Sequence, residues 1–347
     1  MRFSNFLFPA SASAADDGRI IDETLQEARL TDALGFDTIW LAEHHFDGIV
    51  AYVDPVAFAA ALAVATTRVR IGFAVAQMAL HHPIRLAEQV ALIDHISKGR
   101  LIVGLGRGTA YNIYDYQGYG IDHTEAQARF EEAEAIMFEA WKGEPLHFHG
   151  RFFHIRLPEL RPAVLTKPHP YVIRAAATEH GMLEIARRGN PFMMNVQSNA
   201  VTSARMALYR DTLRTIGLDE ATVAAKLDEC WVWRNVYVAE TDAEAEQIAV
   251  PAFVAMHEHR VAMRNRIYAE QKASILPMPP PGAEPPAHAS AEHALVYGSP
   301  STVAEQLAPL KATGVGGLIM QFRLGPMNLE QTAASLRLFT DKVIPAL

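Results

Sequence analysis

A carboxylate and two imidazoles follow a short apolar run early in the chain. Residues 38–41 carry the β-branched and aromatic side chains of a packed strand, and Glu43, His44 and His45 follow closely. Titratable groups at the carboxyl end of a core strand cost free energy to bury, and an active site is the common reason for placing them there. Histidine also titrates near neutral pH, which suits proton transfer. We interpret these three residues as candidate catalytic groups; the alternative is that the histidines only hold the loop.

A glycine-rich segment follows a later strand-like run. Gly104, Gly106 and Gly108 alternate with other residues and flank Arg107. The spacing is GxGxG and not the GxGxxG of dinucleotide-binding folds, and no helical pattern follows at once. The segment therefore predicts either a phosphate contacted by backbone and guanidinium, or simply a tight corner of the fold.

A second segment with small residues leads into a helix. Residues 175–178 are Ala-Ala-Ala-Thr, and the predicted helix begins with Glu179, His180, Gly181 and Met182. The first amides of a helix have no intrahelical partner and bind anions well. Together with the glycine-rich segment, this turn would suit a phosphorylated ligand.

Metal binding and hydrolysis are the competing interpretations of the histidines. His147 and His149 would share one face of a strand, and His257 and His259 lie in a helical pattern. However, no HExxH motif occurs, no carboxylate cluster accompanies these pairs, and the GxSxG motif of serine hydrolases is absent. We expect no metal site and favour an organic cofactor.

Composition limits the class of protein and its partners. The chain has 347 residues, a formal net charge of −8 and one cysteine, Cys230. The negative charge gives no reason to expect nucleic acid or an anionic membrane as a partner. A single cysteine excludes an internal disulfide, and no segment approaches the ~20 apolar residues of a membrane span. We expect a cytoplasmic protein in a reducing compartment.

Strand-like and helical patterns alternate along the chain and predict how these groups are positioned. Eight strands are expected, over residues 2–8, 38–41, 69–75, 101–105, 171–177, 191–195, 230–238 and 315–321. Regular alternation indicates a parallel sheet, and eight β-α units in a chain of this length indicate a (β/α)₈ TIM barrel. We therefore expect one α/β domain over residues 1–347, with its active face at the carboxyl ends of the strands.

Three segments interrupt the alternation. Residues 106–121 and 145–160 are predicted insertions, and alternation of histidine and phenylalanine over 147–155 indicates a hairpin in the second. The stretch LPMPPPGAEPPAHAS can neither continue a helix nor enter a central strand. We expect residues 258–296 to form either a mobile lid over the barrel or a flexible insertion.

Several sequence motifs, taken in their order along the chain, resemble those of the bacterial luciferase-like family of flavin-dependent monooxygenases. The most specific are the EHHF strand end and the ISKGR…GRG segment. The resemblance covers nearly the whole chain except the proline-rich stretch, and its segments are Met1–Phe8, Leu34–Phe46, His81–Gly108, Ala128–Phe130, Leu165–Ile173 and Tyr297–Met320.

The resemblance implies a TIM barrel that uses reduced FMN and O₂ to oxygenate a small organic substrate through a peroxide adduct of the flavin. It also implies a separate flavin reductase that supplies the reduced FMN, and a homodimer formed through residues 54–66 and 83–96. Two alternatives remain: hydride transfer with a deazaflavin or FMN, and a flavin-binding protein without turnover.

The resemblance also assigns roles to individual residues. It implies phosphate binding by Arg107, Arg129 and the turn 178–182, which agrees with the anion sites expected above. The flavin ring would lie at Ala74 and Val75, where relatives often have a non-prolyl cis peptide. His44 matches the family's catalytic histidine, and we expect Glu43 or a neighbour to orient it. Position 106, a reactive cysteine in luciferase, is glycine here, which puts luminescence with long-chain aldehydes in doubt.

Overall fold

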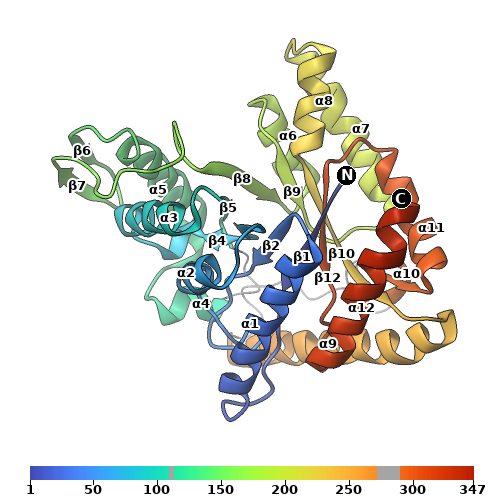
Figure 1. Cartoon of the computed structure of the whole chain (residues 1–347). Helices are drawn as coiled ribbons and strands as arrows, with labels where there is room; N and C mark the ends of the chain where they lie inside the picture. Colours follow the sequence, from blue (N-terminus) through green and yellow to red (C-terminus); the bar gives the residue numbers. More distant parts are fainter. Residues whose placement is uncertain (109–112, 272–289) are drawn as a thin grey trace.

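Eight parallel strands close into a barrel within residues 1–108, 113–271 and 290–347, which the computed structural model describes (Figure 1). The order around the barrel is β1-β2-β3-β5-β8-β9-β10-β12, and β12 returns to β1. Each expected strand is present, so the predicted TIM barrel is confirmed. The strands are β1 (Arg2–Leu7), β2 (Thr38–Leu41), β3 (Arg70–Phe73), β5 (Leu101–Gly106), β8 (Tyr171–Ala176), β9 (Phe192–Met194), β10 (Trp231–Val238) and β12 (Gly317–Gln321).

Two short strands extend the sheet beyond the expected eight. β4 (Ala76–Gln77) follows β3 and pairs with the end of β5, while β11 (Leu295–Gly298) pairs with the last residues of β10. The peptide bond between Ala74 and Val75, in the link from β3 to β4, is cis, as the resemblance implies.

Helices cover the outside of the barrel, and polar caps define where several of them begin. The side chain of Asp54 accepts hydrogen bonds from the first amides of α2, and Asn328 forms a capping box at the start of α12. The outer helices are α1 (Asp17–Leu34), α2 (Pro55–Ala65), α3 (Pro83–Ser97), α5 (Ala126–Ala140), α6 (Glu179–Arg187), α7 (Asn199–Thr215), α8 (Glu220–Glu229), α11 (Pro300–Lys311) and α12 (Leu329–Leu338). Shorter turns are η1 (Met78–Leu80), η3 (His123–Glu125), η5 (Phe339–Val343) and η6 (Ile344–Ala346).

Aromatic side chains fill the barrel interior. Trp40 and Trp231 lie edge to face with ring centroids 5.1 Å apart, and Phe6 meets Trp233 in the same geometry at 5.0 Å. The Trp40 and Trp231 side chains are buried, so they close the barrel below the level where its strands end.

The second predicted insertion is a hairpin, and the first contains a short helix. β6 (Leu146–His149) and β7 (His154–Leu157) pair antiparallel, which confirms the expected hairpin. α4 (Ile113–Gly118) lies in the first insertion.

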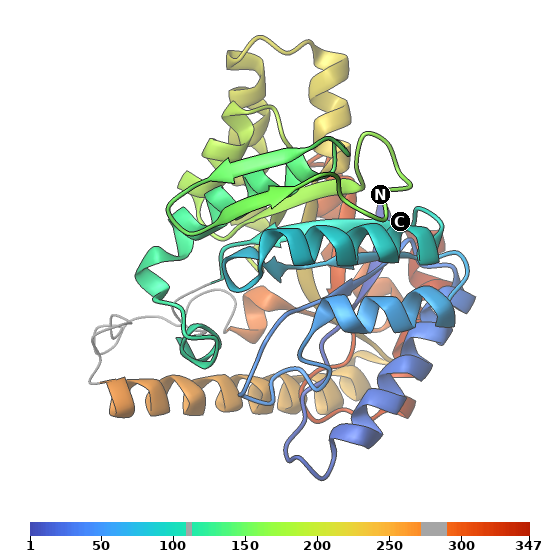
Figure 2. The ribbon, with the colours of Figure 1, turned by 90° about the vertical axis from the view of Figure 1, so that its left-hand side faces the viewer.

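α9 (Asp242–Gln271) crosses the carboxyl end of the barrel. This helix of 30 residues lies along one end of the barrel in Figure 1, and Figure 2 shows the same from the side. The predicted lid segment 258–296 therefore begins inside a helix and ends in α10 (Ala291–Ala294) and β11. Its residues 272–289 lie outside the described part of the chain. None of the described helices is long and apolar enough to cross a membrane.

Candidate functional site

A cavity of about 1090 Å³ lies at the carboxyl ends of the barrel strands. Residues from β1, β4, β5, β8, β10, α5, α6 and α9 line it, together with the segment that follows β2 and the link from β3 to β4. This is the face on which TIM barrels carry their active sites, and the volume is at the upper end of that of small-molecule sites.

The two ends of the cavity differ in chemistry. One end is largely apolar and aromatic, and its walls include Phe6, Phe8, Ile49, Trp233 and Val261. The other end is polar and is lined by Arg107, Gln127, Glu131, Arg174, Thr178, Glu184 and Arg188. A ligand with an anionic end and an apolar body would match this division.

Glu43 is the centre of a buried hydrogen-bond network at the cavity wall. Its Oε1 lies 3.0 Å from Nε2 of His45 and 2.9 Å from Nε2 of His81. Its Oε2 accepts a hydrogen bond of 2.5 Å from the backbone N–H of Gln77. Burial raises the pKa of Glu43, but the field of His81 and these hydrogen bonds outweigh burial and bring the pKa down to about 2. The carboxylate is therefore ionised and bound on both sides.

The pKa values of the two histidines beside Glu43, His45 and His81, are shifted in the opposite direction, upward. Burial lowers the pKa of each imidazole, but the Glu43 carboxylate outweighs burial and holds the pKa of both His45 and His81 above the usual range. His45 is further tied to the loop, since its Nδ1 lies 3.3 Å from the hydroxyl of Tyr119 and its backbone amide donates to Asp115. His45 does not line the cavity, and these contacts fit a residue that holds the loop.

His44 points the other way, into the cavity. Its Nδ1 is buried without a hydrogen-bond partner among the residues that the structure describes. Burial, and next the positive charge of Arg260, lower the pKa of His44 to about 3, so the imidazole is neutral at physiological pH. The expectation that Glu43 orients His44 is corrected, because the Glu43 carboxylate bonds to His45 and His81 instead.

Close packing explains the glycine-rich segment of β5. A Cβ atom on Gly104 would lie 1.6 Å from the carbonyl oxygen of Phe73, and one on Gly106 would lie 2.4 Å from the Val75 side chain. The tight-corner interpretation therefore accounts for these glycines without a phosphate. Ala74 and Val75 both line the cavity beside them.

Part of the predicted phosphate site is assembled at the polar end. Arg107, whose side chain is exposed, lines the cavity together with Thr178, His180 and Gly181 at the start of α6. There Thr178 caps the helix, with its hydroxyl accepting from the amide of Gly181 at 3.1 Å, and His180 lies beside them on the lining.

Three predicted cofactor residues lie outside the cavity lining. The Arg129 guanidinium lies over the rings of Phe152 and Phe153, 5.1 and 5.3 Å from their centroids, so it faces the hairpin. Met182 is buried in the apolar core beneath α6, and the exposed side chain of Glu179 contributes nothing to the lining.

The sequence assigned no role to three charged groups of this site. His81 is hydrogen-bonded to Glu43. Two nitrogens of the Arg174 guanidinium each donate a hydrogen bond of 2.6 Å to the Glu134 carboxylate. Arg260 lies on α9 and lines the cavity from there. Arg174 lies within a predicted strand, which is the one signal that could have placed it. Arg260 could not be placed without knowing that α9 crosses the barrel.

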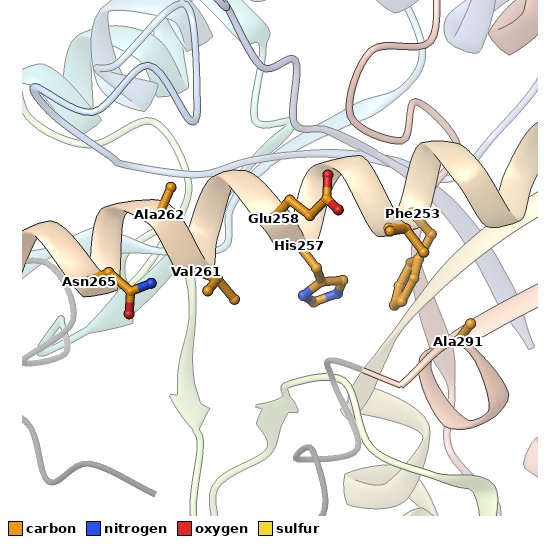
Figure 3. A pocket seen from close by; sticks show the side chains of 8 residues that line it. Phe253, His257, Glu258, Val261, Ala262, Asn265 and Ala291 are labelled. Carbon is orange, nitrogen blue, oxygen red and sulfur yellow. The ribbon is translucent and has the colours of Figure 1, made fainter.

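A smaller cavity of about 390 Å³ runs along α9. Figure 3 shows that side chains four residues apart project from one side of the helix, namely Phe253, His257, Val261 and Asn265. His257 and Val261 also line the main cavity, so the two cavities share a wall.

A metal site is not supported within the described residues. They contain no group of three or more histidine, cysteine, aspartate and glutamate side chains arranged to hold a metal ion. The site therefore offers acid-base groups, anion-binding groups and an apolar wall.

The sequence of the barrel is similar to that of a known protein family over most of its length. The model of the luciferase-like monooxygenase family matches residues 1–316. The chain belongs to this family.

Named relatives in this family are distant from the chain. Limonene 1,2-monooxygenase of Rhodococcus erythropolis is 27% identical over 246 residues, 70% of this chain and 62% of that protein. The oxygenase component of a flavin-dependent trigonelline monooxygenase from Acinetobacter baylyi is 32% identical over 177 residues, 51% of this chain and 49% of that protein. Each alignment thus spans less than two thirds of the relative.

Solved structures agree with the barrel over its full length. Monooxygenase RslO1 from Streptomyces bottropensis matches with a TM-score of 0.82 and 27% identity over 99% of both chains. The fold is shared more distantly with the oxygenating constituent of 3,6-diketocamphane monooxygenase from Pseudomonas putida in complex with FMN, with a TM-score of 0.78 and 20% identity over 99% of this chain and 98% of that one. It is also shared with an F420-dependent secondary alcohol dehydrogenase, with a TM-score of 0.73 and 16% identity over the same shares.

Proposed function

We propose that this luciferase-like protein is a flavin-dependent monooxygenase that uses reduced FMN and O₂ to oxygenate a small organic substrate. The observation that carries the proposal is the divided cavity, with anion-binding groups at one end and His44 in an apolar wall at the other. A phosphorylated cofactor with an aromatic ring system needs both ends of the cavity, and a small organic substrate needs only the apolar end.

The residues of the cavity fit FMN. Arg107 and the first amides of α6 supply a cation and N–H donors for a phosphate. The glycines of β5 keep the central part of the wall flat beside Ala74 and Val75, where a planar ring can approach. We assign the phosphate to Arg107, Thr178, His180 and Gly181; Arg129 could join them only by leaving its two phenylalanine rings.

Reduced FMN, when bound, supplies the electrons that activate O₂. The protein's own contribution is to exclude water and to hold a proton acceptor beside the reacting atoms. We assign the second task to His44, because its buried Nδ1 has no partner in the described residues and its pKa of about 3 keeps the ring neutral. Glu43 and His45 act behind it as positioning residues that hold the strand end.

The second candidate function is hydride transfer with a deazaflavin. It is favoured by the shared fold with an F420-dependent dehydrogenase, and the same polar end could hold that cofactor's phosphate. Equilibrium binding of FMN, reduced FMN and F420 to the purified protein separates the two candidates. We expect FMN in its two redox states to bind and F420 to bind at least about 10-fold more weakly, about 1.4 kcal/mol; preferential binding of F420 would support the alternative.

We also propose two partners. The description of the trigonelline enzyme as an oxygenase component supports a separate flavin reductase as the source of reduced FMN. A homodimer through α2 and α3 is supported by apolar side chains exposed on them, with Val64 77% and Leu92 52% exposed. Sedimentation of the wild type and of Leu92→Glu tests the dimer, which the substitution should weaken.

A further inference from the structure

The polar end of the cavity continues outward between two helices. α5 and α6 lie on either side of β8 (Figure 1). α5 packs against α3 and α6 packs against α7, while another face of each helix borders the cavity. We call the space between them the α5–α6 groove; its walls come from residues 127–134 and 181–188, and its floor from Arg174 and Ala176 of β8.

The wall of the groove that α5 forms is mostly polar and acidic. Gln127, Phe130, Glu131 and Glu134 line it. Their spacing of three, four and seven residues places them on one face of the helix, so this whole face is turned toward the groove. The Gln127 amide donates a hydrogen bond of 2.8 Å to the exposed carboxylate of Glu131. This wall therefore offers oxygen acceptors beside one aromatic ring.

The wall that α6 forms has the same spacing and adds a positive charge. Gly181, Glu184, Ile185 and Arg188 line it, again on one face of the helix, and the Arg188 side chain is exposed. At about 1.5 Å per helical residue, Arg188 lies roughly 10 Å from Gly181 along the helix. The groove thus extends well beyond the turn to which we assign the FMN phosphate.

The floor of the groove lies outside the barrel wall. Two nitrogens of Arg174 donate hydrogen bonds to the Glu134 carboxylate on α5, so this side chain faces the helix layer and its charge is balanced. Ala176 shares that side of the sheet, because side chains alternate along a strand, and its small side chain leaves space above β8. The groove is therefore separate from the barrel interior, where we place the flavin ring.

An adenosine group would complement the walls of the groove. FMN ends at its phosphate and does not reach beyond the start of α6, but a flavin that continues past this phosphate would enter. Ribose hydroxyls donate to a carboxylate in dinucleotide-binding folds, and Glu131 and Glu184 supply carboxylates here. Phe130 and Arg188, on opposite walls, offer an aromatic face and a planar guanidinium, and both groups stack on aromatic rings.

An acidic chain beyond the phosphate would fit the groove less well. It would bring further carboxylates beside Glu131 and Glu184, and like charges at short range repel. The second phosphate of a dinucleotide, in contrast, directly follows the first and stays near Arg107 and the amides at the start of α6. The charges of the groove therefore favour a nucleoside over a polyglutamate tail such as that of F420.

We propose that the α5–α6 groove binds the adenosine phosphate half of FAD, so that the protein binds FAD as well as FMN, and FAD more tightly. The inference rests on the proposed function for the position of the first phosphate. The flavin ring and this phosphate are common to both cofactors, so the assignments of His44 and Arg107 hold for either. The proposal concerns binding and is tested without turnover.

The test compares three probes, FMN, FAD and free AMP, by equilibrium dialysis with absorbance as the readout. We expect the wild type to bind FAD at least about 10-fold more tightly than FMN, which corresponds to about 1.4 kcal/mol. Free AMP is offered to the FMN-loaded protein. It should bind at least about 100-fold more weakly than FAD, because it lacks the covalent link to the flavin.

Three variants locate the adenosine group. Glu131→Trp fills the groove from an exposed position of α5; it should abolish the preference for FAD and leave the FMN affinity within about twofold, which also shows that the variant is folded. Glu139→Trp is the matched control, because Glu139 is exposed on the same helix and does not line the cavity, and it should behave as the wild type. Arg188→Gln should reduce the preference by about threefold without changing the FMN affinity, since one stacking contact is lost.

The proposal is overturned if the wild type binds FAD no more tightly than FMN, or if Glu131→Trp keeps the preference. It is also overturned if free AMP binds the FMN-loaded protein as tightly as FAD binds the flavin-free protein, because the groove would then be a separate nucleotide site. Failure of the protein to bind either flavin would instead count against the proposed function. Binding of FMN without a preference for FAD leaves that function intact and removes only the adenosine site.

Discussion

The carboxylate of Glu43 lies between two imidazoles and is 2.9 Å from Nε2 of His81. His45 binds the same carboxylate from the other side at 3.0 Å. Glu43 is buried, so removing its charge leaves the histidines without their anionic partner. This relationship predicts how the stability of the protein depends on pH.

Glu43→Gln should lower the free energy of unfolding by about 3–5 kcal/mol near pH 6, the range for breaking a buried ion pair. In the folded state the pKa values of His45 and His81 are raised above 6.5, so the stabilisation is complete below that pH and is lost as pH rises through the raised values. The effect of the substitution should therefore be smaller at pH 9 than at pH 6. Urea unfolding of both proteins at the two pH values measures it, and an equal effect at both would contradict the ion-pair assignment.

Arg107→Ala should weaken FMN binding by about 10- to 100-fold, which corresponds to the loss of one charged hydrogen bond. Riboflavin, which lacks the phosphate, should bind to wild type and variant equally. Arg129→Ala should have a smaller effect on FMN, because the Arg129 guanidinium lies over Phe152 and Phe153. Fluorescence titration of both flavins checks these outcomes. Equal losses for FMN and riboflavin would remove Arg107 from the phosphate site.

Gly104→Ala should destabilise the barrel by about 3 kcal/mol or more, since the added methyl group meets the backbone oxygen of Phe73. Gly106→Ala should cost less, about 1–2 kcal/mol, because the atom it meets belongs to the side chain of Val75. Thermal unfolding of the two variants ranks them. The reverse order would show that β5 and the β3–β4 link are packed differently from the structure.

Local patterns predicted most of the barrel, because a strand buried on both faces needs a continuous apolar run. The runs ending at Leu41 and Leu105 are such strands. β4 escaped prediction because it has only two residues, and β11 because it begins inside the segment 258–296 that was expected to be a lid or an insertion.

The candidate site was predictable only where a residue directly follows a strand. His44, Arg107 and Thr178 obey this rule and line the cavity. Arg129 does not, and its guanidinium lies outside the lining because the hairpin offers it two aromatic faces. Arg260 reaches the cavity because a helix crosses the barrel, and no local pattern carries that information.

Because His44 is assigned to proton transfer and not to FMN binding, substituting it should lower turnover without weakening FMN binding. His44→Ala should leave the dissociation constant of FMN within about threefold, since His44 packs against the Phe8 ring and the phosphate is assigned to other residues, Arg107 and the start of α6. His44→Asn is the matched control, because it restores a polar group without an imidazole and should be almost as impaired in turnover. A large loss of FMN affinity in both variants would assign His44 to flavin binding.

Oxygen transfer itself is the most direct test of the account. The protein is supplied with FMN, NADH, a flavin reductase and ¹⁸O₂ and is offered a panel of small organic compounds with apolar rings, and products are analysed by mass spectrometry. We predict a product that contains one ¹⁸O atom with the wild type and at least about 100-fold less of it with His44→Ala, within the range for loss of one general acid-base group. Turnover by His44→Ala near the wild-type rate, or turnover of substrate without ¹⁸O incorporation, would contradict the account.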